Sequence, residues 1–291
     1  MTRSGFTYTA PESIEEAVGL LARLGENAYV MAGGTDLLIK RKHGLIKPEA
    51  VVALKRIKNL DRISIGPKKG LVIGATALIA DVAAHPSIRK IYPAIADAAQ
   101  NTANVQIRNM GTIVGNICNA SPSADNAPTL LAMGATLSIA GPDGSRSLPL
   151  EDFFKGPGIT ALKPAEIVTA VTVPPPPPAS GAAYVHLSAR GKVDCSAVCV
   201  GTQVVMQGLK VKDARVFVGA CAPVPIRAPK AERAVIDTTF SERKAEKAGE
   251  SAAREAAPIT DVRATRDYRN QMVAVLTKRA LIQACKRARR A

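Results

Sequence analysis

The chain has 291 residues, 47% of them apolar, so it is long enough to bury a sizeable core and to form two or three domains. Its formal net charge is +15, but the basic residues are scattered and aromatic residues make up only 3%, which disfavours a nucleic-acid-binding surface built on stacked bases. The five cysteines lack a CxxC pair, the three histidines lie far apart, and no apolar run reaches the length of a membrane span, so we expect a reduced, cytoplasmic protein without a zinc site or a membrane span.

The first half of the chain alternates helices and strands. Ser13 and Glu16 form an S-x-x-E capping box, which predicts a helix that begins at residue 14 and ends at Gly25. A second helix is expected over residues 87–100, and short apolar runs predict strands over 28–32, 50–54 and 70–75. This alternation indicates an α+β or α/β lobe.

The texture of the sequence changes at the proline run of residues 173–178, which no helix or central strand tolerates. We expect a domain boundary there. Beyond it, alternating apolar residues predict an antiparallel meander with strands over 182–189, 196–206 and 214–221. Two helices are expected to close the chain, one over 241–256 and one that begins near Thr265.

A first glycine turn interrupts the apolar residues of "VMAGGTDLL", residues 30–38. It is neither a G-x-G-x-x-G motif nor a P-loop, and it lacks an acidic residue at the spacing of a nicotinamide-binding Rossmann unit. Successive backbone N–H groups at such a turn make an anion-binding nest, and Thr35 and Asp36 add a hydroxyl and a carboxylate beside it. Taken alone, such a Gly-Gly turn is about as often a simple chain reversal as a binding site.

A second stretch, residues 109–135, is nearly uncharged although the chain is strongly basic. Gly111 and Gly115 leave backbone amides approachable, and short polar side chains follow: Thr112, Asn116, Ser121 and Asp125. A surface loop would carry more charge than one aspartate. Two turns with so few side chains suit a long buried ligand that has a central pyrophosphate and polar ends.

"AGGTDLL" and "GTIVGNICNASPSAD" resemble the paired FAD-binding signatures of the medium, flavin-carrying subunit of molybdenum hydroxylases. This family includes the xanthine dehydrogenase, carbon monoxide dehydrogenase and 4-hydroxybenzoyl-CoA reductase type. "FVGACAPVPIRAPKAE" and "RDYRNQMVAVLTKRAL" independently resemble the C-terminal domain of that subunit. The resemblance covers nearly the whole chain in one order.

The resemblance implies an α+β fold with two parts. An FAD-binding lobe of the vanillyl-alcohol-oxidase (PCMH) type would contain two subdomains, residues 1–55 and 56–176. A C-terminal α/β domain with a three-stranded antiparallel sheet and helices would occupy residues 179–288, as in the flavoprotein of carbon monoxide dehydrogenase.

The resemblance also assigns cofactor-binding residues. Residues 30–37 would wrap the FAD diphosphate with backbone N–H groups, the second loop would hold the ribityl and phosphate region, and an aliphatic residue would contact the isoalloxazine ring. Asp125 would bond toward the ribityl or adenosine end. The full set is Val30, Met31, Ala32, Gly33, Gly34, Thr35, Asp36, Leu37, Thr102, Gly111, Thr112, Gly115, Asn116, Ser121, Asp125, Val168 and His186.

Two positions depart from the family pattern. Val114 stands where many relatives have a second glycine, and it would add a branched side chain beside the cofactor. His186 stands where a lysine near the flavin is expected. Histidine stabilises the negative charge of reduced flavin only when it is protonated, so the flavin potential would depend on pH unless Lys192 substitutes or His186 is an ordinary strand residue.

The family resemblance implies an electron-transfer function without catalytic side chains or bound metal in this chain. A large molybdopterin subunit would oxidise the substrate, and a small subunit would relay electrons through iron-sulfur clusters. FAD would then pass them in pairs to an acceptor such as NAD, in a dimer of heterotrimers. Some relatives carry a cysteine-rich loop for a four-iron cluster, but the cysteines here do not cluster, so FAD alone is expected, and Cys118, Cys195 and Cys199 are interpreted as packing residues.

Two alternatives stay open at this point. A stand-alone flavoenzyme of the same fold would need an acid or base near the ring, for which Tyr184 and His186 are the candidates. A basic binding module that has lost its flavin would be colourless, and the retained glycines argue against it.

Overall fold

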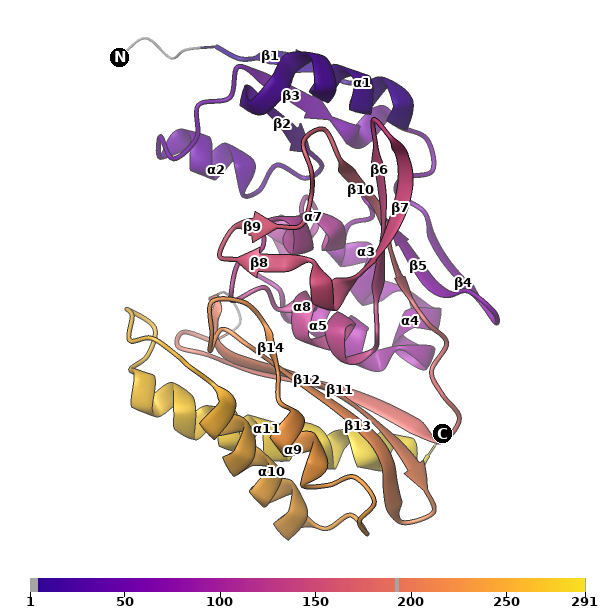
Figure 1. The fold of residues 1–291 in the computed structure, drawn as a ribbon, viewed down its shortest axis with the longest axis vertical. Helices are drawn as coiled ribbons and strands as arrows, with labels where there is room; N and C mark the ends of the chain where they lie inside the picture. The colour runs from indigo at the N-terminus through magenta and orange to yellow at the C-terminus, as the bar shows by residue number, and fades with distance from the viewer. Residues whose placement is uncertain (1–4, 192–193, 291) are drawn as a thin grey trace.

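A computed structural model describes residues 5–191 and 194–290. The N-terminal part, at the top of Figure 1, is built on a three-stranded parallel sheet in the order β1-β3-β2. The predicted first helix is confirmed, since the Ser13 hydroxyl accepts the Glu16 N–H at 3.1 Å and Gly25, with φ of 72°, ends the helix. The elements are β1 Thr7–Thr9, α1 Ile14–Leu24, β2 Ala28–Met31, α2 Leu37–Lys42 and β3 Ala50–Ala53.

The middle part contains a five-stranded antiparallel sheet in the order β4-β5-β10-β6-β7. Its strands are β4 Ile63–Gly66, β5 Gly70–Gly74, β6 Thr136–Gly141, β7 Gly144–Pro149 and β10 Ile167–Val173. A small hairpin, β8 Phe154–Gly156 and β9 Ile159–Thr160, lies between β7 and β10 in the chain. Since β10 comes last in sequence but pairs between β5 and β6, residues far apart in the chain share one sheet.

Six helices accompany this sheet within the described residues. They are α3 Ile79–Ala84, α4 Pro86–Ile91, α5 Pro93–Asn101, α6 Val105–Arg108, α7 Ile113–Cys118 and α8 Asn126–Ala132. The single helix predicted over 87–100 is therefore wrong in its continuity, because it divides at Tyr92, which has φ of −124° and ψ of 52°. Pro93 causes the division, since it lacks an N–H group and disfavours helical backbone at the preceding residue.

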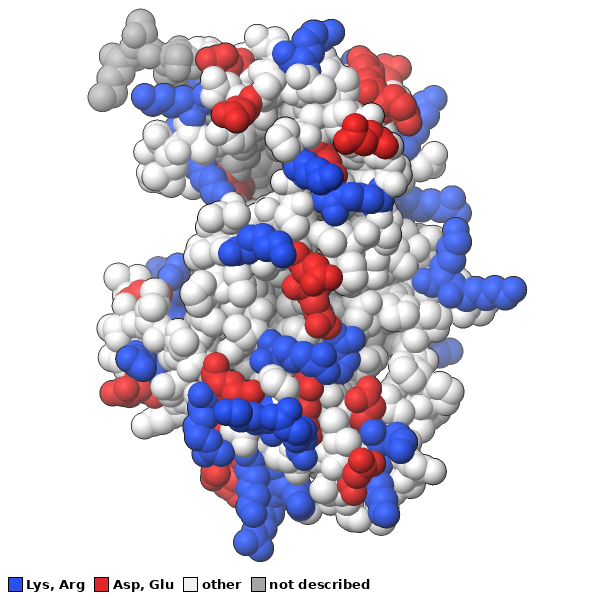
Figure 2. Space-filling view, in the orientation of Figure 1, with Lys and Arg blue, Asp and Glu red and all other residues white. Residues whose placement is uncertain are grey.

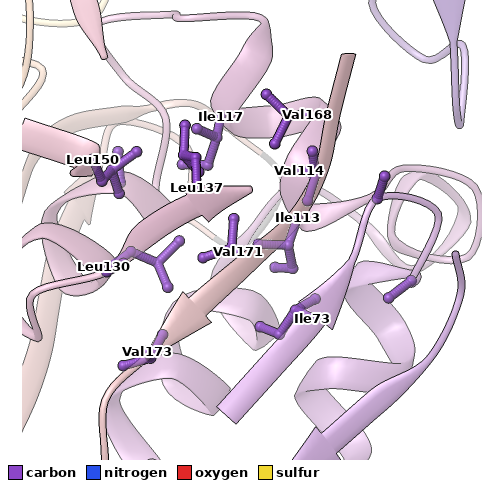
Figure 3. Packing of buried hydrophobic residues seen from close by; sticks show 14 of the residues in the cluster. Ile73, Ile113, Val114, Ile117, Leu130, Leu137, Leu150, Val168, Val171 and Val173 are labelled. Atoms are coloured by element: carbon purple, nitrogen blue, oxygen red, sulfur yellow. The ribbon is translucent and has the colours of Figure 1, made fainter. Parts of the chain in front are cut away.

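The core of this part lies between α7 and the sheet, as Figure 3 shows. Ile113 and Ile117 of α7 are fully buried against side chains of the sheet that include Leu137 of β6 and Val171 of β10. Ile113 and Ile117 are four residues apart, so they share one face of the helix. The opposite side of α7 is thereby left free to border a cavity.

The C-terminal part is an antiparallel sheet in the order β11-β12-β13-β14. The three predicted strands are present, and the expected three-stranded sheet is corrected to four because the two-residue β14 adds to its edge. α11 packs on one face with α10 behind it, while α5 and α8 face the other side (Figure 1). The elements are β11 Ser180–Ser188, β12 Ser196–Gln207, β13 Lys210–Gly219, β14 Ile226–Arg227, α9 Pro229–Arg233, α10 Glu242–Glu255 and α11 Arg266–Ala288.

Two glycines let helix α8 approach this sheet closely. A Cβ atom on Gly201 would lie 2.4 Å from the carbonyl carbon of Pro128, and one on Gly219 would lie 2.9 Å from Pro128 Cγ. Side chains at these positions would therefore force α8 away from β12 and β13. An ion pair between Arg287 and Asp97, at 2.8 Å, adds a second link between the two parts.

Charged residues of both signs are distributed over the surface shown in Figure 2, with acidic side chains among the basic ones. The same view is hollowed on its left side, below the segment that carries α2 in Figure 1. Within residues 5–191 and 194–290, no helix is long and apolar enough to cross a membrane.

Candidate functional site

A cavity of about 660 Å³ opens between the N-terminal sheet and the middle part of the chain. Its volume falls in the range typical of cofactor sites, roughly 300–1,000 Å³. All residues of the predicted set except His186 line it, although they come from three separate stretches of sequence and from β10. The structure therefore brings residues 30–37, Thr102, the 111–125 stretch and Val168 together.

The first glycine turn presents unpaired backbone donors to this cavity. No hydrogen bond among the described residues takes up the N–H groups of Gly33, Gly34, Thr35 or Asp36. Gly34 has φ of 72°, a conformation that favours glycine, and its carbonyl accepts the Leu38 N–H at 3.0 Å as α2 begins. Successive free N–H groups around a left-handed residue make a nest that suits the oxygens of an anion.

The first turn also touches the second loop directly. A Cβ atom on Gly33 would lie 2.1 Å from the Met110 carbonyl oxygen and 2.8 Å from Gly111 Cα. A Cβ atom on Gly111 would in turn lie 3.4 Å from Thr35 Oγ1. The contact between the two loops is therefore enough to explain the glycine at position 33, because any side chain there would keep the loops apart.

The second loop forms a capped helix rather than an open turn. Thr112 precedes α7, and its hydroxyl accepts the Gly115 N–H at 2.9 Å. A Cβ atom on Gly115 would lie 2.8 Å from that hydroxyl oxygen, so the glycine leaves room for the cap. Val114, the departure noted in the sequence, fits inside this helix and is 4% exposed.

Asn126 organises two predicted site residues from behind. Its side-chain N–H₂ group donates to Asn116 Oδ1 and to Thr102 Oγ1, both at 3.1 Å. Thr102 donates its own hydroxyl to the Ala98 carbonyl at 2.9 Å, so both functions of this hydroxyl are used within the chain. Asn116 keeps its amide N–H₂ donors without a partner among the described residues.

A polar bridge crosses the cavity rim between α2 and the end of α7. Lys40 Nζ donates to Asn119 Oδ1 at 2.6 Å, and Asn119 Nδ2 donates to Asp36 Oδ1 at 3.1 Å. Both Lys40 and Asn119 line the cavity, and neither is in the predicted set. Lys40 and Asn119 are 79 residues apart in the sequence, so no local pattern indicated that they meet.

Asp125 lines the cavity and is only 6% exposed. Its Oδ1 atom accepts the Tyr184 hydroxyl at 2.7 Å and also accepts the Ser196 hydroxyl. Burial raises the pKa of the Asp125 carboxyl, while the hydrogen bonds from Ser196 and Tyr184 oppose that shift. The hydroxyl of Ser121, which also lines the cavity, pairs with the Ser123 hydroxyl at 3.2 Å.

The wall formed by β10 and its preceding loop is apolar with one fixed carboxylate. Val168 is 3% exposed and lies at the bulge where the pairing of β10 with β6 shifts. Glu166 accepts both Arg146 Nε and Arg146 Nη2 at 2.7 Å. Hydrogen bonding from Arg146 lowers the pKa of the Glu166 carboxyl, so it stays ionised and clamps this loop.

His186 is outside the cavity lining, so the structure does not bring it together with the other residues of the predicted set. It lies on β11, where its ring stacks on Tyr184 with centroids 5.7 Å apart. Nδ1 is 3.2 Å from Ser196 Oγ, and Nε2 is 3.1 Å from Asn101 Oδ1. Strand alternation turns this side chain toward α5. Lys192, the suggested substitute, lies outside the described residues.

The cysteines divide into two groups. Cys199 is fully buried and Cys118 packs against the core, as interpreted from the sequence. Burial raises the pKa of the Cys118 thiol to about 12, which keeps it unreactive at neutral pH. The interpretation of Cys195 as a core residue is wrong, because β12 begins only at Ser196 and Cys195 is exposed at the cavity edge.

Among the described residues, no group of three or more His, Cys, Asp or Glu side chains is arranged to hold a metal ion. The cavity instead combines an anion nest, amide donors, a buried carboxylate and an apolar wall. These groups fit FAD, whose diphosphate needs N–H donors, whose ribityl and adenosine ends need polar partners, and whose ring needs apolar contacts.

Two family models match the chain. The model described as the FAD binding domain in molybdopterin dehydrogenase matches residues 4–176, and the CO dehydrogenase flavoprotein C-terminal domain matches residues 183–284. The chain belongs to this family of FAD-binding subunits of molybdopterin dehydrogenases.

Particular relatives match over almost their full length. The carbon monoxide dehydrogenase medium chain of Hydrogenophaga pseudoflava is 32% identical over 280 residues, 95% of this chain and 96% of the relative. The putative xanthine dehydrogenase FAD-binding subunit of Escherichia coli is 30% identical over 279 residues, 96% of this chain and 95% of the relative. Among solved structures, a chain of reconstituted CO dehydrogenase from Oligotropha carboxidovorans superposes with a TM-score of 0.93 at 33% identity, covering 99% of this chain and 100% of that one.

Proposed function

We propose that this chain is the FAD-carrying medium subunit of a molybdenum hydroxylase complex, which collects electrons from a partner subunit and passes them to an external acceptor. The observation that carries the proposal is that residues 33–36, whose N–H groups have no partner among the described residues, line one cavity together with the amide of Asn116 and the carboxylate of Asp125. Family membership and superposition over the whole chain support the same role.

The residues divide the work of holding the cofactor. Residues 33–36 bind the diphosphate oxygens, Asn116 and Asp125 hold polar groups of the ribityl or adenosine end, and Val168 excludes water from the ring. Thr102, committed to Ala98 and Asn126, positions the amide that fixes Asn116. When bound, FAD supplies the conversion between paired and single electron transfers, and the chain supplies orientation and electrostatics.

The division of the chain follows from the same proposal. Residues 1–55 and 56–176 form the two FAD-binding subdomains, and residues 179–288 form the C-terminal domain. The three large sheets support these limits, since the first ends at residue 53, the second spans residues 63–173 and the third begins at residue 180.

A stand-alone flavoenzyme is disfavoured by the positions of its candidate acid and base. The Tyr184 hydroxyl is committed to Asp125, and neither Tyr184 nor His186 lines the cavity. Burial raises the pKa of Tyr184 well above its ordinary value, so the phenol does not serve as a base at neutral pH. A basic module without flavin is disfavoured by the retained nest.

Partner subunits follow from the names of the relatives. Medium chains and FAD subunits of dehydrogenases work beside other chains, so we infer a large molybdopterin subunit and a small iron-sulfur subunit as partners here. We further propose a dimer of heterotrimers, NAD as the acceptor and a cytoplasmic location. Free thiols among the described residues support the last of these.

The test is an absorption spectrum of the purified full-length chain, before and after incubation with FAD, followed by acid release of the chromophore. We expect one FAD per chain and, when the neighbouring genes are co-expressed, additional iron-sulfur absorption from bound partners. A colourless chain that cannot be loaded with FAD contradicts the cofactor role. FAD binding without any copurifying partner contradicts the subunit role.

A further inference from the structure

A chain of side-chain hydrogen bonds connects the cavity to α5. Asp125 Oδ1 accepts the Ser196 hydroxyl, Ser196 Oγ lies 3.2 Å from His186 Nδ1, and His186 Nε2 lies 3.1 Å from Asn101 Oδ1. Ser196 is 1% exposed and Asp125 is 6% exposed, so water does not compete for their contacts. Asp125, Ser196 and His186 link the cavity to Asn101 of α5 and therefore depend on one another for hydrogen-bond donors and acceptors.

The donors and acceptors around His186 indicate the protonation state of its ring. The single hydroxyl hydrogen of Ser196 is used toward Asp125, so Ser196 Oγ faces His186 Nδ1 as an acceptor. Asn101 donates its Nδ2 to the Asp97 carbonyl at 2.7 Å, which orients its Oδ1 as an acceptor toward His186 Nε2. Both ring nitrogens therefore face acceptors, an arrangement that a ring with a hydrogen on each nitrogen, an imidazolium, satisfies.

We propose that His186 is held as an imidazolium by Ser196 and Asn101 and that its charge, placed behind the cavity wall, keeps Asp125 ionised as an acceptor for the cofactor. His186 is thus a positioning residue that acts through Ser196, and it does not touch the ligand. The proposal rests on the proposed FAD site, since Asp125 serves that site.

Asp125 has one oxygen available for this purpose. Tyr184 and Ser196 both donate to Oδ1, and no hydrogen bond among the described residues occupies Oδ2, while the residue lines the cavity. An ionised carboxylate offers Oδ2 to a hydroxyl or amine donor of the ribityl or adenosine end. Burial raises the pKa of the Asp125 carboxyl, and the hydrogen bonds from Ser196 and Tyr184, together with the charge of a nearby His186 ring, oppose that shift.

The other titratable groups around His186 are either uncharged or already paired, so the His186 ring is the cation that partners Asp125. Tyr184, stacked on the ring from β11, and Cys199, opposite His186 on β12, both have pKa values raised well above their ordinary values by burial, so neither is charged at neutral pH. On α5, Asp97 is paired with Arg287 at 2.8 Å. His186 and Asp125 therefore form a neutral pair through one hydroxyl.

The first experiment reads the charge directly in the full chain without cofactor. The chain has only three histidines, so long-range proton–nitrogen NMR spectra of nitrogen-15-labelled histidine, with His186→Gln for assignment, resolve the His186 ring at pH 7. We expect both nitrogens to carry hydrogens. A neutral tautomer with a bare Nδ1 would mean that Ser196 donates to His186 and would overturn the proposal.

The second experiment measures FAD affinity by fluorescence quenching at pH 6.5 and 8.5. In His186→Gln the lost cation leaves Asp125 partly protonated, so we expect FAD to bind about tenfold more weakly at pH 6.5, with recovery at pH 8.5. His186→Lys restores a cation and recovers at least part of the affinity at pH 6.5. His43→Gln, the same substitution at an exposed histidine, leaves the affinity unchanged.

The outcomes separate this inference from the function proposed above. Equal losses at both pH values in His186→Gln, or no rescue by His186→Lys, would overturn the positioning role. A wild-type chain that fails to bind FAD would refute the proposed function, and the NMR spectra of the unloaded chain would still decide whether His186 is charged. Circular dichroism of each variant confirms that the sheet has formed.

Discussion

Both loops at the cavity contain two glycines, but the structural reasons for these glycines differ. In the first loop, Gly33 is required by contact with the Met110 carbonyl and Gly34 by its left-handed backbone. In the second loop, Gly115 makes room for the Thr112 hydroxyl that caps α7. The first loop leaves its N–H groups free, whereas the second uses the Gly115 N–H for its own cap.

This difference indicates where a ligand is bound and where it is only bordered. Free donors at residues 33–36 suit direct contact with an anion, and the capped second loop supplies a rigid surface against which the first is placed. A missing side chain is thus not by itself evidence of a ligand, because the neighbouring loop also excludes a Cβ atom at Gly33.

The largest effect is expected for Gly33→Ala, which tests whether the loops must touch. Its Cβ atom would lie 2.1 Å from a backbone oxygen, so one loop must move, at a cost of about 2–3 kcal/mol in unfolding free energy. FAD affinity should fall more than tenfold. Denaturant unfolding and FAD titration measure both, and Gly19→Ala, on the exposed face of α1, is the control that should not weaken the chain. Unchanged stability of Gly33→Ala would contradict the close contact.

The next effect separates backbone strain from ligand contact. Gly34 and Gly44 have φ of 72° and 71°, so alanine at either position should cost about 1 kcal/mol in stability. Only Gly34 lies in the cavity, so only Gly34→Ala should also weaken FAD binding. Thermal unfolding and FAD titration of both variants provide the comparison. Equal FAD affinity in the two variants would show that the turn at Gly34 does not contact FAD.

A smaller effect is expected from the cap of the second loop. Thr112→Val removes the acceptor for the Gly115 N–H and should cost about 1 kcal/mol, while Thr112→Ser keeps it and should stay within a few tenths. FAD affinity should follow stability only weakly, since this loop borders the ligand. The measurement is denaturant unfolding of the two variants, and a loss in Thr112→Ser as large as in Thr112→Val would show that the methyl group contributes as much as the cap.

The smallest effect concerns the reactivity of the thiols, which alkylation tests without changing the fold. Cys118 in the second loop, with a pKa of about 12, should stay unmodified at pH 8, since the thiolate is the reactive form. Cys195, exposed at the cavity edge, should be labelled, and bound FAD should slow that labelling. Mass spectrometry of labelled peptides locates the modification. Labelling of Cys118 at the rate of Cys195 would mean that the second loop opens.

Much of the C-terminal fold was predictable because its elements are long and regular. The strands β11, β12 and β13 are long runs rich in valine and other apolar residues, and Thr265 caps α11 at the expected place. The middle sheet was harder, since β7 is the polar sequence GSRSLP and shows no apolar face. Its pairing through β6 to β10 joins residues about thirty apart, which local patterns do not reveal.

Most cavity residues were predictable from two sequence motifs, but the long-range contacts that bring other residues to the cavity were not. Lys40 and Asn119 bond across 79 residues of sequence, and Cys195 reaches the cavity from the C-terminal part, so no local signal placed them there. His186 was predicted beside the flavin from its alignment with a lysine. The orientation of its strand turns it toward α5 instead, where it bonds Asn101.

The fit between Pro128 and the glycines of the C-terminal sheet has a consequence for recombination. Although two family models divide this chain near its proline run, the two segments are not interchangeable parts. A hybrid that joins residues 1–176 of this chain to the C-terminal segment of a relative would need glycine at the positions of Gly201 and Gly219, since a Cβ atom on Gly201 would meet backbone atoms of residues 128 and 129. Natural exchange between such genes is therefore expected to preserve both glycines.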